Sequence, residues 1–163
     1  MLDLCTGNGS LAVLAAMAWP AASVDACDLS ADALAVARSN VDRHGLSGRI
    51  SLRQGDGLAA AAGRYDLILC NPPYVSAASM AALPPEYRAE PALALSGGDD
   101  GMDFVRTLMS DVTRYLNDDG LLVLEIGHER PNFEAAFSHL QPAWLPTSEG
   151  DDQVLLLERR GLA

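Results

Sequence analysis

The chain has 163 residues, of which 49% are hydrophobic, and its 22 acidic against 11 basic residues give a formal net charge of −11. This length fits one globular domain with a buried core, and the composition is unlike that of a disordered segment. The acidic balance argues against a surface that binds phosphate backbones, because such binding needs clustered Lys and Arg, but it is compatible with a basic protein partner.

The first half of the chain alternates short apolar runs with helix-like segments. Strands are predicted at 1–5, 23–28, 49–54 and 65–70. Helices are predicted at 10–19 and at 30–44, where Ser30 can cap the start and Gly45 can end the helix.

The second half begins with a long loop, predicted at 74–100 and rich in proline and glycine. A loop of this length in a compact domain is usually functional, as a lid or wall, although packing by Leu83, Tyr87 and Leu93 would also explain it as a structural loop. The remaining elements are a helix at 104–116, a strand at 120–126, a helix at 133–140, and a hairpin of 144–147 with 154–158 around a turn at 149–152.

Alternating strands and helices with short connections predict an α/β fold with a mostly parallel sheet and right-handed crossovers. The terminal hairpin would add an antiparallel edge. The chain has no internal repeat and no interdomain linker, so one domain is predicted over 1–163. Because the chain begins inside its first strand, we expect a missing amino-terminal segment that carries at least one covering helix.

Cys5, Cys27 and Cys70 have no paired spacing, which is typical of free thiols in a reducing compartment. No apolar run reaches membrane-spanning length and no signal-peptide pattern opens the chain, so a cytoplasmic location without membrane association is predicted. The three histidines are scattered without metal-ligand spacing, and no metal site is expected.

The motif Asn71-Pro72-Pro73-Tyr74 directly follows the predicted strand at 65–70. Ligands bind at the carboxyl ends of strands in open parallel sheets, which is where this motif falls. The Asn71 amide can donate and accept, the prolines stiffen the backbone and leave two carbonyls without local donors, and Tyr74 adds an aromatic wall. Such a site suits a planar –NH2 group whose nitrogen lone pair is aimed at an electrophile. A proline-stiffened turn after a strand is the plainer alternative.

The predicted turn from the first strand into the first helix is Asp3-Leu4-Cys5-Thr6-Gly7-Asn8-Gly9. Gly7 and Gly9 permit sharp turns and the close approach of a ligand. The third glycine of the dinucleotide fingerprint is absent, which disfavours a pyrophosphate and favours a nucleoside that carries an amino acid tail. Asp3 could then receive an ammonium group, directly or through water.

Two more strands end in acidic residues. Asp28 closes the strand at 23–28 and is placed to accept both ribose hydroxyls, although capping the next helix is an alternative role. Asp56 follows the third strand, in Gly55-Asp56-Gly57, and could accept from an adenine amine, although an ordinary turn aspartate explains it as well. The order and register of these motifs together predict one nucleoside site.

In these motifs the chain resembles class I S-adenosylmethionine-dependent methyltransferases, over essentially all of its length. Within them it resembles the protein-glutamine N5-methyltransferases, which share the Asn-Pro-Pro-Tyr motif with adenine-amino DNA methyltransferases. The branch that modifies a glutamine of a large-subunit ribosomal protein is more similar than the branch that modifies release factors. The supporting stretches are 71–75, 83–91, 93–95, 97–101 and 122–127. The chain departs from the family by lacking its amino-terminal helical domain and by carrying Asn8 in the glycine turn.

The resemblance implies a Rossmann-like, seven-stranded sheet with an antiparallel terminal hairpin strand. It also implies S-adenosylmethionine as the cofactor and S-adenosylhomocysteine as its product. Asn71, Pro72 and Tyr74 would be catalytic, and Pro73 would join them in binding substrate. Cofactor contacts are expected from Asp3, Cys5, Thr6, Gly7, Gly9, Asp28, Leu29, Asp56, Gly57 and Asn71.

The implied reaction methylates the side-chain amide of a glutamine in a protein, by resemblance a basic ribosomal protein. The Asn71 side-chain oxygen and the Pro72 carbonyl would accept the two amide hydrogens, and Tyr74 would stack on the amide and stabilise developing positive charge. One alternative is a nucleic-acid adenine-amino methyltransferase. The net charge of −11 opposes it, because direct nucleic-acid binding needs clustered basic residues and is not expected here. Another is a truncated fold that binds cofactor but is inactive.

Overall fold

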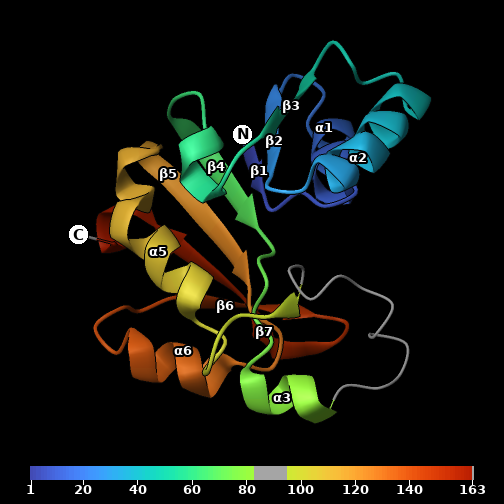
Figure 1. Cartoon of the computed structure of the whole chain (residues 1–163). Helices are drawn as coiled ribbons and strands as arrows, with labels where there is room; N and C mark the ends of the chain where they lie inside the picture. Colours follow the sequence, from blue (N-terminus) through green and yellow to red (C-terminus); the bar gives the residue numbers. More distant parts are fainter. Residues whose placement is uncertain (83–94, 163) are drawn as a thin grey trace.

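The computed structural model describes residues 1–82 and 95–162. Its centre is a seven-stranded sheet in the order β3-β2-β1-β4-β5-β7-β6 (Figure 1). The strands are β1 (Leu2–Leu4), β2 (Val24–Asp28), β3 (Ile50–Gln54), β4 (Tyr65–Cys70), β5 (Leu116–Glu125), β6 (Ala143–Thr147) and β7 (Gly150–Glu158). Strands β1 to β5 pair in parallel, and β7 pairs antiparallel with both β5 and β6. The predicted fold class is confirmed, including the antiparallel terminal hairpin.

The helices are α1 (Ser10–Ala18), α2 (Ala31–Arg43), α3 (Ala77–Ala82), α5 (Asp103–Asp111) and α6 (Arg130–Ala136), with short 3-10 turns η1 (Gly57–Ala60), η3 (Val112–Arg114) and η4 (Arg159–Gly161). Helix α2 begins and ends as its sequence predicts. The Ser30 hydroxyl accepts from the backbone N–H of Ala33 at 3.1 Å, which satisfies a first-turn donor. Gly45, just past the helix, has a φ of 66, a left-handed conformation that glycine adopts without strain.

Helices cover both faces of the sheet (Figure 1). Neighbouring residues of a strand point to opposite faces, so Leu2, which pairs with Asp25, faces away from the side to which Val24 points. Val24 belongs to a core that also contains residues of α1 and α2, whereas Leu2 belongs to a larger core with residues of α5 and α6. This arrangement leaves the carboxyl ends of the parallel strands uncovered at one edge of the sheet.

Several boundaries differ from the sequence-based prediction; the helix predicted at 133–140, for example, is α6 at Arg130–Ala136. The predicted loop at 74–100 contains helix α3, while its part at 83–94 lies outside the described residues. Strand β5 starts at Leu116, inside the predicted helix at 104–116, because this buried leucine pairs with Tyr65. The predicted turn at 149–152 is wrong, since β7 already begins at Gly150 and pairs there with Thr147. Asp151 and Asp152 are exposed strand residues, although acidic residues beside a glycine are typical of a turn.

Within 1–82 and 95–162, no helix combines the length and the apolar character that a bilayer crossing requires. The same residues contain no group of three or more His, Cys, Asp or Glu side chains able to hold a metal ion. The three cysteines are free thiols. Burial raises the pKa of Cys27 to about 11 and raises that of Cys70, so both thiols are protonated near neutral pH.

Candidate active site

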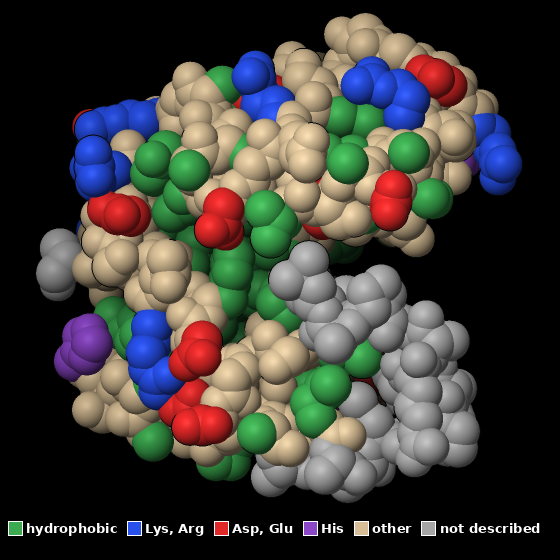
Figure 2. Space-filling view, in the orientation of Figure 1, with side chains coloured by type: hydrophobic (Ala, Val, Ile, Leu, Met, Phe, Trp, Pro, Cys, Tyr) green, Lys and Arg blue, Asp and Glu red, His purple; other side chains and the backbone are tan. Residues whose placement is uncertain are grey.

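One large cavity, of about 1430 Å³, lies at the carboxyl ends of β1 to β5. Figure 2 shows the molecule hollowed between the part that carries α2 and the part that carries α3. The lining includes predicted site residues from the ends of β1 to β4: Cys5, Thr6, Gly7, Asp28, Leu29, Asp56, Gly57, Asn71, Pro72, Pro73 and Tyr74. The structure therefore brings most of the residues predicted for the site together. Asp3 and Gly9 lie outside this lining.

The glycine turn leaves β1 through a series of left-handed residues. Cys5 has a φ of 60, unusual for a residue with a side chain, and Gly7 and Gly9 have φ values of 54 and 81. A Cβ on Gly9 would lie 3.0 Å from the Cβ of Ala37, so this glycine lets α1 begin close against α2. A Cβ on Gly7 would meet nothing within 4 Å. Gly7 therefore presents an open stretch of backbone to the cavity.

Asp3 lies beneath this turn and is fully buried. Its Oδ2 accepts from the hydroxyl of Thr6 at 2.5 Å and from the backbone N–H of Ala12 at 2.9 Å. Its Oδ1 is buried and has no hydrogen-bond partner among the described residues. Burial raises the pKa of Asp3 to about 6, against the opposing effect of its hydrogen bonds from Thr6 and Ala12. Thr6 itself lines the cavity, so the unsatisfied carboxylate oxygen belongs to a residue immediately behind the cavity wall.

Asp28 ties the end of β2 to the glycine turn. Its Oδ2 accepts from the backbone N–H of Gly7 and its Oδ1 from that of Ser30, both at 2.8 Å. Ser30, not Asp28, provides the side-chain cap of α2. The Asp28 carboxylate is left on the cavity wall with further lone pairs that a hydroxyl group could use.

The turn after β3 supplies another part of the wall. Asp56 and Gly57 line the cavity, and the Asp56 side chain does not cap the short η1 turn that follows it. A Cβ on Gly57 would lie 3.7 Å from the ring of Phe104, which lines the same cavity. Leu29, 48% exposed, adds an apolar surface on the β2 side. Carboxylate and apolar surfaces thus alternate along this end of the cavity.

The motif after β4 forms a further part of the wall, next to the turn after the paired strand β1. Asn71 is exposed within the lining, and Pro72 is buried. The chain beyond the motif is held by backbone hydrogen bonds, from the Val75 N–H to the Leu95 carbonyl at 2.8 Å and from the Gly97 N–H to the Val75 carbonyl at 2.9 Å. The Tyr74 hydroxyl donates to Oε1 of Glu125, at the end of β5, over 3.4 Å.

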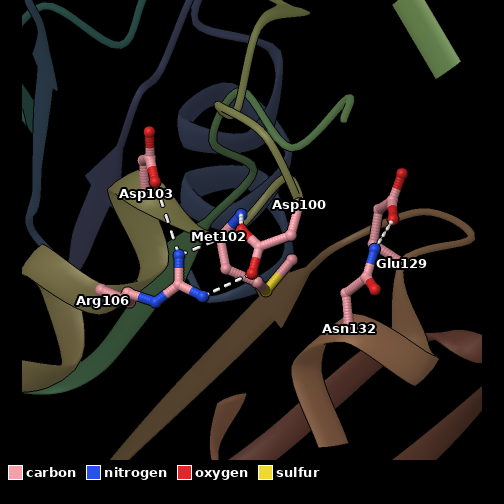
Figure 3. A network of polar contacts seen from close by, with 6 residues as sticks. All are labelled: Asp100, Met102, Asp103, Arg106, Glu129 and Asn132. Atoms are coloured by element: carbon pink, nitrogen blue, oxygen red, sulfur yellow. Dashed lines mark hydrogen bonds and ion pairs between the residues drawn. The ribbon is translucent and has the colours of Figure 1, made fainter. Parts of the chain in front are cut away.

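Two polar clusters hold the segments around Tyr74 (Figure 3). In the first, Asp100 accepts from the backbone N–H of Met102 at 3.1 Å and from Arg106 at 3.0 Å. Hydrogen bonding to the Arg106 guanidinium lowers the pKa of Asp100, so this exposed pair remains charged over the neutral range. The cluster fixes the turn that leads from Gly101 into α5.

The second cluster centres on Glu129, which is 9% exposed and lines the cavity. One of its oxygens accepts from the Asn132 side chain at 2.5 Å (Figure 3). The other lies 3.4 Å from both the backbone nitrogen of Ser76 and the hydroxyl of Ser79. Glu129 therefore connects the β5–α6 turn with the segment that follows Tyr74.

Sequence reasoning missed part of the cavity wall. The missed lining residues include Ser79, Asp103, Phe104, Thr107, His128, Glu129, Glu149 and Gln153. The residues just after β5 could have been found, because the carboxyl end of another parallel strand predicts a site there. The helix α5 residues had no comparable signal, since their position depends on how the helix packs over the sheet.

The order of the strands and the helices on both faces give the fold of class I methyltransferases. A ribosomal protein L11 methylase from Lactobacillus delbrueckii has a TM-score of 0.64 and 24% identity, over 96% of this chain and 67% of that one. A methyltransferase from Pyrococcus furiosus has a TM-score of 0.69 and 17% identity, over 97% and 73%. These likenesses concern the fold. A model of the methyltransferase small domain matches residues 1–83, and the chain belongs to that family.

Curated relatives are similar over almost the whole chain. A ribosomal protein uL3 glutamine methyltransferase from Bordetella pertussis is 62% identical over 99% of this chain and 54% of its own length. One from Burkholderia pseudomallei is 58% identical over 96% of this chain and 54% of its own length. The chain thus spans about half the length of the curated relatives it matches.

Membership of this family implies S-adenosylmethionine as the methyl donor, and the cavity has room for that molecule. Its ribose hydroxyls need acceptors, and the Asp28 carboxylate on the cavity wall has lone pairs that could fill this role. Its ammonium group needs a negative charge nearby, and the unsatisfied Oδ1 of Asp3 lies behind the wall at Thr6. The open backbone at Gly7 leaves room for the amino acid tail. These residues follow β1 and β2, whereas Tyr74 follows the neighbouring strand β4.

Proposed function

We propose that this chain is the catalytic domain, over 1–163, of an enzyme that methylates the side-chain amide nitrogen of a glutamine in ribosomal protein uL3. The observation that carries the proposal is that Asn71, Pro72 and Tyr74 line the same cavity as the glycine turn and Asp28. The residues expected to bind the cofactor and those expected to bind the amide therefore line one cavity. The names of the relatives at 62% and 58% identity support uL3 as the substrate.

The chemical problem is that a carboxamide nitrogen is a poor nucleophile, because its lone pair is delocalised into the carbonyl. S-adenosylmethionine supplies an electrophilic methyl group on a sulfonium when it is bound. Asn71 and Pro72 would bind and orient the nucleophile, because the Asn71 side-chain oxygen and the Pro72 carbonyl can accept the two amide hydrogens. Held in this way, the nitrogen is aligned for attack, and positive charge that develops on it is stabilised by two acceptors.

Tyr74 would complete the substrate end of the cavity. Its ring provides a flat face of negative potential against the amide as the nitrogen becomes positive. Both amide hydrogens stay hydrogen-bonded to the two acceptor oxygens during methyl transfer. The transfer makes the nitrogen acidic, and one of these protons then passes to water. The residues of the glycine turn and Asp28 would bind and orient the donor.

The charges of the wall favour a protein substrate over a nucleic acid. The lining contains Asp28, Asp56, Asp103, Glu129 and Glu149, and within the described part of the chain it contains no Lys or Arg. A phosphate backbone would be repelled by this wall, whereas a basic ribosomal protein would be attracted to a chain with a net charge of −11. Such a substrate is consistent with the cytoplasmic location that the sequence predicts.

The test is a methyl-transfer assay with labelled S-adenosylmethionine. The acceptors are uL3 from cells that lack its methylation and, in parallel, duplex DNA that contains adenine. We expect label in uL3 only, and mass spectrometry should locate one methyl group on a glutamine side chain. Label in DNA would favour the adenine-amino alternative. Cofactor binding without transfer to either acceptor would favour an inactive fold.

A further inference from the structure

We propose that Gly127 is a positioning residue for Tyr74, because its missing side chain is what allows the tyrosine ring to occupy its place at the substrate end of the cavity. Gly127 follows β5 and has a φ of 52. The packing of Gly127 against Tyr74 does not depend on what the chain does, whereas its effect on turnover rests on the function proposed above. Gly127 would touch neither donor nor acceptor and would act through the ring.

The steric evidence is direct. A Cβ placed on Gly127 would lie 2.5 Å from Cε2 of Tyr74, 3.0 Å from Cζ and 3.2 Å from Cδ2. Real Cβ atoms do not approach other carbons so closely, so an alanine here requires one side of the ring to move. The Tyr74 hydroxyl is meanwhile directed to Glu125, two residues before Gly127, at 3.4 Å. The end of β5 therefore contacts the tyrosine both at its ring and at its hydroxyl.

The backbone of Tyr74 is closely packed and has little room to move. A Cβ on Gly101 would lie 2.2 Å from the Tyr74 carbonyl oxygen, and one on Gly97 would lie 2.8 Å from its Cα. The Gly97 N–H donates to the carbonyl of Val75, the next residue, at 2.9 Å. Tyr74 is thus enclosed by glycine backbone from two segments that are distant in sequence.

Both segments are anchored by the polar clusters described above (Figure 3). Asp100 and Arg106 hold the turn that contains Gly101. On the other side, the backbone N–H of Glu129 donates to the carbonyl of Ile126 at 3.1 Å, which closes the turn around Gly127. Because hydrogen bonds hold both walls, we expect a side chain at Gly127 to displace the ring.

Tyr74 lines the cavity, and so does Gly127. A displaced ring would alter the wall against which the amide is to be held, and small misplacements of a positioned group reduce turnover strongly. The cofactor end is formed by other elements, at Gly7 and Asp28, and should not respond. A selective loss of turnover is therefore the expected signature.

The experiment compares Gly127→Ala with Gly45→Ala. Gly45 has a similar positive φ of 66, but a Cβ there would meet nothing within 4 Å, so the control carries the same backbone strain without the clash. We expect Gly127→Ala to lower kcat by about 100-fold and to leave the Kd for S-adenosylmethionine within about twofold of native. The control should retain native kcat and Kd.

A double-mutant cycle separates positioning from general damage. Once Tyr74→Ala has removed the ring, adding Gly127→Ala should lower the remaining turnover by less than about threefold, because no clash is left. If Gly127→Ala alone does not fold, the double variant should fold. A second loss as large as the first, or a double variant that also fails to fold, would overturn the proposal.

The position of the Tyr74 ring can also be followed without enzyme turnover, so this test remains valid if the proposed function is wrong. With ring-labelled tyrosine, the NMR signal of Tyr74 is assigned from its absence in Tyr74→Phe. Gly127→Ala should shift that signal and Gly45→Ala should not. An unshifted ring would refute the positioning role whatever the enzyme methylates, whereas a shifted ring in a chain without transferase activity would refute only the proposed function.

Discussion

The backbone N–H of Gly7 donates to Oδ2 of Asp28 at 2.8 Å, which joins the turn after β1 to the end of β2. The second oxygen of Asp28 accepts from the Ser30 N–H at the same distance. Each carboxylate oxygen has another lone pair, so Asp28 can shape the turn and still accept hydrogen bonds from a ligand. The residue that the sequence predicts for ribose binding is therefore also part of the scaffold of the site.

Asp28→Ala should weaken both cofactor binding and the fold. Removing the carboxylate leaves the N–H groups of Gly7 and Ser30 without their acceptors, which should cost about 2 kcal/mol of unfolding free energy. The Kd for S-adenosylmethionine, measured by calorimetry, should rise by at least about tenfold through the lost hydroxyl contacts. Asp32→Ala, on the first turn of α2, removes an equal charge outside the lining and should leave the Kd unchanged. An unaltered Kd in Asp28→Ala would exclude the ribose role.

Asn71→Ala should abolish turnover and spare the fold. Asn71 is exposed in the cavity wall, so truncating it removes an acceptor without opening the core. Loss of one such preorganised group typically lowers kcat by about 100- to 1000-fold. Cofactor affinity should change by less than about fivefold, since Gly7 and Asp28 remain intact. The matched control is Asn117→Ala, whose side chain donates to Asp66 at 2.7 Å outside the lining. Near-native rates for Asn71→Ala would contradict the two-acceptor model.

Some parts of the fold and site could be predicted from the sequence, because they depend on residues that are close together in the chain. Strand β4 could be recognised because its apolar run is bounded by polar and proline residues, and α2 because Ser30 and Gly45 mark its ends. The site residues at strand ends could be predicted because parallel topology brings all carboxyl ends to one edge. Each of these inferences uses information within a few residues of the position concerned.

Other features depend on packing between distant segments and could not be predicted. The contact of Gly127 with Tyr74 joins two strand ends whose spacing only the sheet determines. Asp3 was expected to contact a ligand, yet it is fully buried behind Thr6, because the first strand is central in the sheet. The start of β5 at Leu116 was hidden by polar residues at 117–119, which resemble a turn. Leu116 pairs with Tyr65 and Leu121 pairs with Leu67, and the polar residues lie in the irregular register between these two pairs.

Arg49→Ala should destabilise the chain without affecting the site. The Arg49 guanidinium donates to the carbonyls of Ala16 at 2.6 Å and Pro20 at 3.0 Å, and so satisfies acceptors at the end of α1. Their loss should cost about 2 kcal/mol and lower Tm by roughly 4–8 °C in calorimetry. Arg43→Ala, exposed on the last turn of α2, should lower Tm by less than about 2 °C. Equal shifts in both variants would mean that the capping network contributes nothing.

Asp3 should make stability fall as pH rises. Its pKa is raised from 3.8 to about 6 in the folded chain by burial, so the folded state binds more protons than the unfolded state between these values. Unfolding free energy is therefore lost as pH increases through this window, by roughly 3 kcal/mol in total. Urea unfolding at pH 4.5, 5.5 and 6.5 should show this loss relative to Asp3→Asn, which can still accept from Thr6 and Ala12. Parallel pH profiles for both proteins would show that Asp3 titrates normally.

Cofactor binding should couple to the same proton. If the ammonium group of S-adenosylmethionine lies over Thr6, its positive charge favours the ionised carboxylate of the buried Asp3 and lowers the pKa of that residue. The Kd should then decrease as pH rises from 5 to 6.5, and binding near pH 5.5 should release protons. Calorimetry in two buffers with different ionisation enthalpies measures that release. Asp3→Asn should bind more weakly and release none of these protons, whereas Asp25→Asn, a carboxylate outside the cavity lining, should behave as native. Equal proton release by the Asp3 variant and the native chain would assign the ammonium group to another acceptor.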